Sequence, residues 1–80
     1  MNPEIMMLKG QLVEANKKLH NANMEAHAVV LSLRQMINPF IDASSLKTEE
    51  ISAAAKRLHS LVCEMKELRK SISEMEDGLG

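Results

Sequence analysis

The stretch from residue 37 to residue 50 reads INPFIDASSLKTEE, and it separates two segments that both carry a helical pattern. Pro39 predicts that the first helix ends at or just before Asn38, because the residue before a proline disfavours the α conformation. Thr48, which two glutamates follow, predicts the N-cap of the second helix, with Ser45 as a rival one turn earlier. About ten residues are then left to reverse the direction of the chain.

Each segment carries one stripe of apolar or alanine residues whose steps alternate between three and four, which is the heptad pattern of a coiled-coil helix. The first stripe is Ile5, Leu8, Leu12, Ala15, Leu19, Ala22, Ala26, Val29, Leu33 and Met36. The second stripe is Ile51, Ala54, Leu58, Leu61, Met65, Leu68, Ile72, Met75 and Leu79. Both segments therefore predict amphipathic helices.

The outer ends of the two helices carry their own signals. Asn2 is a candidate N-cap, and Pro3 suits the first helical position because its missing N–H has no partner there. Gly78 predicts the residue that terminates the second helix. We expect one domain over residues 1–80, with helices over about 3–37 and 48–77 and a corner over 38–47.

The residue numbers indicate that the chain folds back on itself. If residues whose numbers add up to 87 face one another, the two stripes match over nine layers, such as Ala26 with Leu61 and Ala22 with Met65. All four alanines in these layers face a larger residue, and such pairing fills a core without voids. The fold class expected is all-α, a two-helix antiparallel coiled-coil hairpin. In this register Lys9 and Glu76 share an edge.

The chain has more apolar residues than the contact between the two helices, here called the seam, can bury. With Ile5 and Ile51 as heptad position a, four e positions on one edge near the corner are apolar. A contiguous apolar edge on a small chain marks an interface, so we expect a homodimeric four-helix bundle. The expected interface residues are Val30, Leu31, Ile37, Phe40, Ile41, Ala55 and Val62. Within the corner, Phe40, Ile41 and Leu46 are expected to plug the open end of the seam.

The composition excludes several classes of function. The net charge is −1, and Phe40 is the only aromatic residue, which leaves no stacking platform for single-stranded nucleic acid. No basic stretch precedes an apolar run at the N-terminus, and no apolar run approaches the ~20 residues that span a bilayer. We expect a cytoplasmic protein with no signal peptide, no membrane partner and no cofactor. Nucleic acid is an unfavoured partner, although the second helix carries basic residues at Lys56, Arg57, Lys66, Arg69 and Lys70.

Few residues are candidates for metal binding or catalysis. His20, His27 and His59 all fall on heptad position b, and His59 and Cys63 lie one turn apart with Glu67 one turn further. Structural zinc is normally held by four ligands that include several cysteines, so solvent-facing side chains are the favoured interpretation. Cys63 on a helix surface lacks an oxyanion hole and a pocket, so no catalytic residue is expected.

The pattern as a whole favours a non-enzymatic, self-associating helical hairpin that acts as a small adaptor, chaperone-like or inhibitor protein. The architecture resembles that of small bacterial and phage-encoded coiled-coil proteins, including secretion-chaperone-like hairpins, and the resemblance is one of architecture only. The alternative is a small nucleic-acid-binding regulator that uses the basic residues of the second helix.

Overall fold

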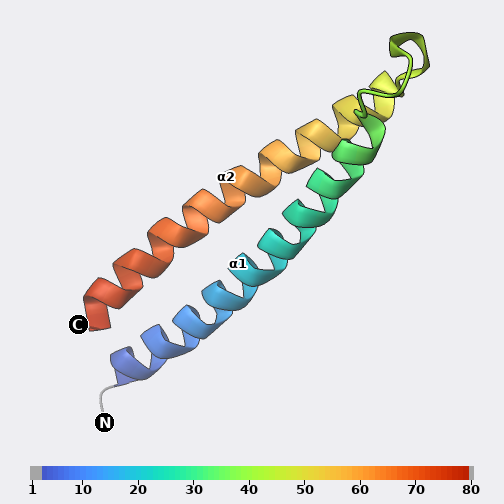
Figure 1. The fold of residues 1–80 in the computed structure, drawn as a ribbon. Helices are drawn as coiled ribbons and strands as arrows, with labels where there is room; N and C mark the ends of the chain where they lie inside the picture. The colour runs from blue at the N-terminus through green and yellow to red at the C-terminus, as the bar shows by residue number, and fades with distance from the viewer. Residues whose placement is uncertain (1–2, 80) are drawn as a thin grey trace.

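The computed structural model describes residues 3–79 and shows an all-α helical hairpin. Helix α1 spans Pro3–Met36, a short 3-10 helix η1 spans Ala43–Ser45, and helix α2 spans Thr48–Leu79. The two long helices run antiparallel, side by side, and the corner lies at the end opposite the termini (Figure 1). The molecule measures 64 × 16 × 14 Å, so it is only two helices thick. The expected fold class is confirmed; the candidate N-cap Asn2 lies outside the described residues.

The seam between α1 and α2 contains the residues that the heptad stripes predict. From Leu8 to Leu79, every stripe residue is buried or half-buried. The most deeply buried are Ala15, Ala22, Ala26, Leu61 and Ile72. Ile5 is the exception at 43% exposed, because α2 ends at Leu79 and none of the described residues lies in the layer that would face Ile5.

The central cluster supports the predicted register. Ala22, Ala26 and Leu61 form one buried cluster, with Val29, Leu58 and Met65 packed against it. These six side chains are the members of three consecutive predicted layers. Leu61 is only 1% exposed, since small alanines face it and larger residues flank it.

Helix α2 begins at Thr48, as expected, but its N-cap lies one residue earlier than predicted and its last residue two positions later. The carbonyl of Lys47 accepts the first helical bond, from the Ile51 N–H at 2.9 Å, so Lys47 rather than Thr48 is the N-cap. The chain enters the helix early because the Thr48 N–H donates to the Leu46 carbonyl at 3.0 Å. At the other end α2 continues through Gly78, which has no positive φ, and so it includes one more half-buried seam residue.

The corner is an ordered pair of turns. Asn38 accepts the Phe40 N–H through Oδ1 at 2.9 Å and the Ile41 N–H through its carbonyl at 3.0 Å. Asp42 caps η1, since its Oδ1 accepts the Ser44 N–H at 3.1 Å. Side chains of this type stabilise turns by hydrogen bonding to backbone two residues further on. The corner is therefore held by its own polar groups.

The prediction that Phe40 plugs the seam is wrong. Its side chain is 94% exposed, because the turn at Asn38 directs it away from the helices. Ile41 is 37% exposed and lines a hollow beside Met36, while Leu46 is half-buried. Smaller side chains thus cover the end of the seam, and the one aromatic ring of the chain stands at the tip of the molecule.

Candidate interaction surface

The hairpin has two edges where α1 and α2 meet, and their character differs. One edge is formed by heptad position g of both helices, and on it Arg57 of α2 bonds Glu25 of α1. The Arg57 Nη2 atom lies 2.6 and 2.7 Å from the two carboxylate oxygens, and Nε lies 3.2 Å from one of them. This contact shows that the g positions share an edge, so the e positions must share the opposite one.

The ion pair resolves a conflict that the sequence raises. The register places Glu25 and Glu64 on the same edge, where two like charges repel. Arg57 compensates for both of them: its pKa is raised by the hydrogen bond to Glu25, then by the charge of Glu25, with a further contribution from Glu64. Arg57 was grouped with the other basic residues of the second helix, although its g position already placed it beside Glu25. We call the g edge, with these three residues, the charged edge.

The opposite edge carries four of the predicted interface residues, which we call the apolar edge: Val30, Ile37, Ala55 and Val62. Val30 and Ile37 are 39% and 54% exposed, Ala55 is exposed and Val62 is half-buried. The Ile37 N–H still bonds the Leu33 carbonyl at 2.8 Å, so Ile37 keeps its place on this edge although α1 ends at Met36. Both helices thus present apolar side chains to solvent along the half of the edge near the corner.

The remaining predicted interface residues lie elsewhere. Leu31 is 58% exposed and occupies heptad position f, on the side of α1 that faces away from α2. Phe40 and Ile41 lie in the corner. The structure therefore groups the four residues of the apolar edge and separates the other three from them.

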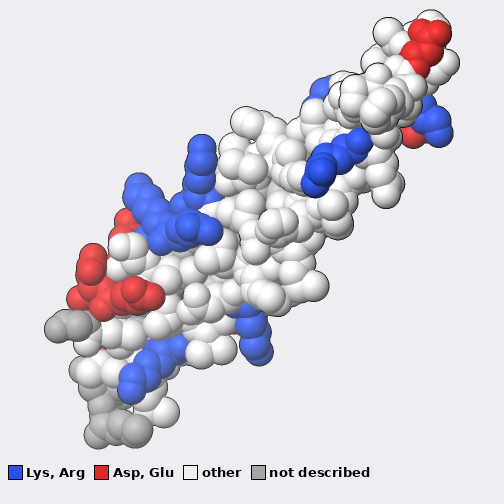
Figure 2. All heavy atoms as spheres, in the orientation of Figure 1, with Lys and Arg blue, Asp and Glu red and all other residues white. Residues whose placement is uncertain are grey.

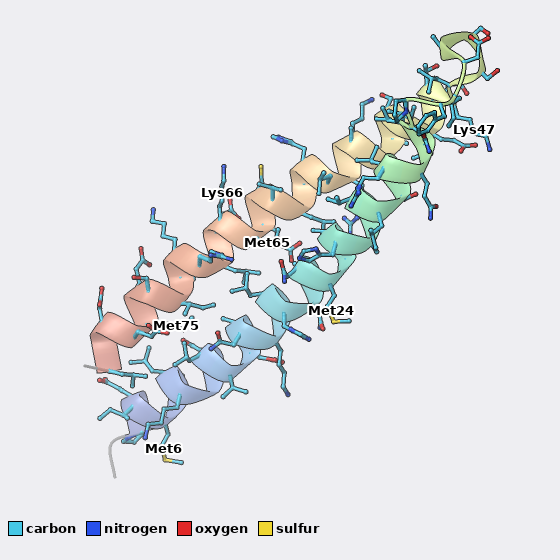
Figure 3. The ribbon with its side chains drawn as sticks, in the orientation of Figure 1. Met6, Met24, Lys47, Met65, Lys66 and Met75 are labelled. Atoms are coloured by element: carbon cyan, nitrogen blue, oxygen red, sulfur yellow. The ribbon has the colours of Figure 1, made fainter. Side chains whose placement is uncertain are left out.

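A second apolar surface runs along the outer side of α1. Met6, Val13, Met24 and Leu31 occupy positions b and f and are between 54% and 59% exposed. Figure 3 shows Met6 and Met24 pointing away from α2, whereas Met65 and Met75 point from α2 toward α1. Flexible methionine side chains suit surfaces that adapt to a partner. Heptad positions b and f are neighbours on the outer side of the helix, so these four side chains share one surface.

The basic residues of α2 are sorted around the helix. With Arg57 bound to Glu25, four are left, at positions b, e and f: Lys56, Lys66, Arg69 and Lys70. Glu64 and Glu67 occupy positions g and c, on the other side. Lys and Arg side chains gather over the C-terminal half of α2 (Figure 2), and Lys66 points away from α1 (Figure 3). Glu76 and Asp77 occupy positions e and f near the C-terminal end of α2, so the side that carries the four basic residues also carries two acidic ones.

The imidazole and thiol groups form one contact. Cys63 Sγ lies 3.6 Å from His59 Nε2, and both residues are exposed. Within residues 3–79, no group of three His, Cys, Asp or Glu side chains could hold a metal ion. Across the same residues, neither helix has a stretch long and apolar enough to cross a membrane.

Comparisons of this chain with protein-family models, with curated proteins and with solved structures found no match.

Proposed function

We propose that the protein is a non-enzymatic protein interaction module whose hairpin pairs with a second copy along the apolar edge. The resulting four-helix bundle would leave the corner and the outer side of α1 exposed for a protein partner. Such a role corresponds to that of a small adaptor, chaperone-like or inhibitor protein.

The observation that carries this proposal is the surface area. The chain exposes 6327 Å², whereas a compact monomer of 8.9 kDa exposes about 4,800 Å². The excess of about 1,500 Å² falls within the roughly 1,000–2,500 Å² that each chain of an obligate homodimer buries. A body two helices thick leaves nearly every residue at the surface, and pairing two hairpins removes this excess.

The hollows on the surface support a role without catalysis. One of them, of about 520 Å³, is an open groove lined by Met7, Gly10, Gln11, Glu14, Ala15, Lys18 and Leu68. Its titratable groups are one carboxylate and one ammonium, with no nucleophile beside a base. A groove of this composition suits packing against another protein.

The mass in solution tests the self-association. Sedimentation equilibrium at micromolar concentration should give twice 8.9 kDa, with the helical content of the hairpin retained. A monomer that remains helical and unfolds cooperatively at the same concentration would contradict the proposal, because the hairpin would then be stable without covering its apolar edge.

The sorted basic residues of α2 favour a second candidate, a nucleic-acid-binding regulator. Four cations on one side of a helix can contact phosphates, and such binding falls steeply as salt rises. Random-sequence duplex DNA should then bind at about 20 mM salt and be released by about 200 mM. We place this candidate second because the net charge is −1 and one of the five basic residues is bound to Glu25.

A further inference from the structure

We propose that the two hairpins pair side by side with both corners at the same end, so that α1 of each copy faces α2 of the other. This inference rests on the proposed self-association and adds its direction. It follows from the order of polar and apolar side chains along the edge that carries the e positions.

A twofold axis parallel to the helices keeps every residue at its own height. In the hairpin, e-position residues of α1 and α2 lie opposite one another when their residue numbers add up to 85. Lys9 and Glu76 form one such pair, and Asn16 and Arg69 form another. The rotation therefore brings Lys9 opposite Glu76 of the second copy. At the same sum Val30 meets Ala55 of the second copy, whereas Val62 lies opposite Asn23 and Ile37 lies opposite Thr48.

Both kinds of contact are favourable in this arrangement. Lys9 and Glu76 make no ion pair with any residue of their own chain among residues 3–79, so each is free to pair across the interface. The twofold axis makes each ionic contact occur twice, at the end where the termini lie. Nearer the corner, Val30 of each copy meets Ala55 of the other, so this apolar contact also occurs twice. The charged edge offers no such match, because Glu25, Arg57 and Glu64 occupy it.

An antiparallel pair of hairpins, with the two corners at opposite ends, is unfavourable whether the hairpins overlap fully or only in part. With full overlap, an antiparallel pair would place Lys9 against Ile37 of the second copy and Asn16 against Val30, which buries polar groups without partners. An offset that matches the apolar halves, centred near Val30, would overlap over only about 24 residues, or about 36 Å of the 64 Å length. Less of the exposed surface would then be covered.

The direction has a visible consequence at the corner. Both Phe40 rings, each 94% exposed in the single hairpin, would stand at the same end of the bundle. The dimer would thus present two aromatic side chains together rather than one at each end.

Distances between spin labels test the direction and the pairing separately. A nitroxide on Ala43→Cys, in a chain whose own thiol is removed by Cys63→Ser, reports the distance between corners by pulsed electron paramagnetic resonance. Ala43 is exposed and lies in η1. The proposed dimer should give about 20–30 Å, which is the width of two adjacent hairpins. Full antiparallel overlap would give about 60 Å, and the offset antiparallel pair about 40 Å; either result overturns the proposed direction.

A label on the native Cys63 is the control for pairing itself. This residue is exposed and lies near the middle of the hairpin, so the two labels stay within measurable distance in either direction. A signal at Cys63 with a long distance at Ala43→Cys contradicts the direction alone. The absence of dipolar coupling at both positions contradicts the self-association as well.

Discussion

Leu61→Ala should lower the free energy of unfolding by about 2–5 kcal/mol, the range for a leucine truncated in a closed core. Leu61 is 1% exposed and belongs to the buried cluster with Ala22 and Ala26. These two alanines are too small to fill the space that the lost side chain leaves, so the upper half of the range is expected. Urea unfolding followed by circular dichroism, at one protein concentration for all variants, measures the change.

Phe40→Ala is the matched control for this truncation. It removes more carbon atoms than Leu61→Ala, yet from a side chain that is 94% exposed, so the free energy of unfolding should change by no more than about 0.5 kcal/mol. A loss at Phe40 comparable to that at Leu61 would mean that the ring is covered in solution. A loss below about 0.5 kcal/mol at Leu61 would contradict its place in the core.

Val30→Glu should weaken the pairing of two hairpins by about 100-fold or more. The twofold axis places the new carboxylate in the interface twice, and each unpaired buried charge costs at least about 1.4 kcal/mol. In the single hairpin Val30 is 39% exposed, so the substitution leaves the helix itself intact. Sedimentation equilibrium should show a shift from dimer to monomer at micromolar concentration.

Leu31→Glu provides the comparison at the neighbouring position. Leu31 is 58% exposed, but it faces away from α2 rather than along the apolar edge. The same change one residue further along α1 should therefore leave the dimer mass unchanged. Dissociation by Leu31→Glu with retention of the dimer by Val30→Glu would move the interface to the outer side of α1.

Local signals were sufficient for most of the architecture. The heptad stripes predicted the buried seam from Leu8 to Leu79, because the two stripes match over nine layers in which every alanine faces a larger residue. Pro39 excluded a continuous helix, so the hairpin followed. Ile5 was predicted to lie in the seam but is exposed, because the stripe shows the periodicity of one helix and does not show where the other helix ends.

The candidate surface was only partly predictable. Heptad letters identify which residues share an edge, and they assign Val30, Ile37, Ala55 and Val62 to four e positions. They also gave Leu31 its outward f position, but counting apolar residues grouped it with the interface. Arg57 was missed because a cation among glutamates resembles a solvated face until the opposite helix brings Glu25 within 2.6 Å.

The sequence by itself determined the two helices, their direction and the residues between them, because these depend on spacing along the chain and on burial of apolar side chains. Only the tertiary structure decided that Arg57 pairs with Glu25 and where Phe40 points. The first depends on the reach of the Arg57 guanidinium across the seam. The second depends on hydrogen bonds at Asn38, which set the turn and hold the ring in solvent against the preference of an apolar side chain for burial.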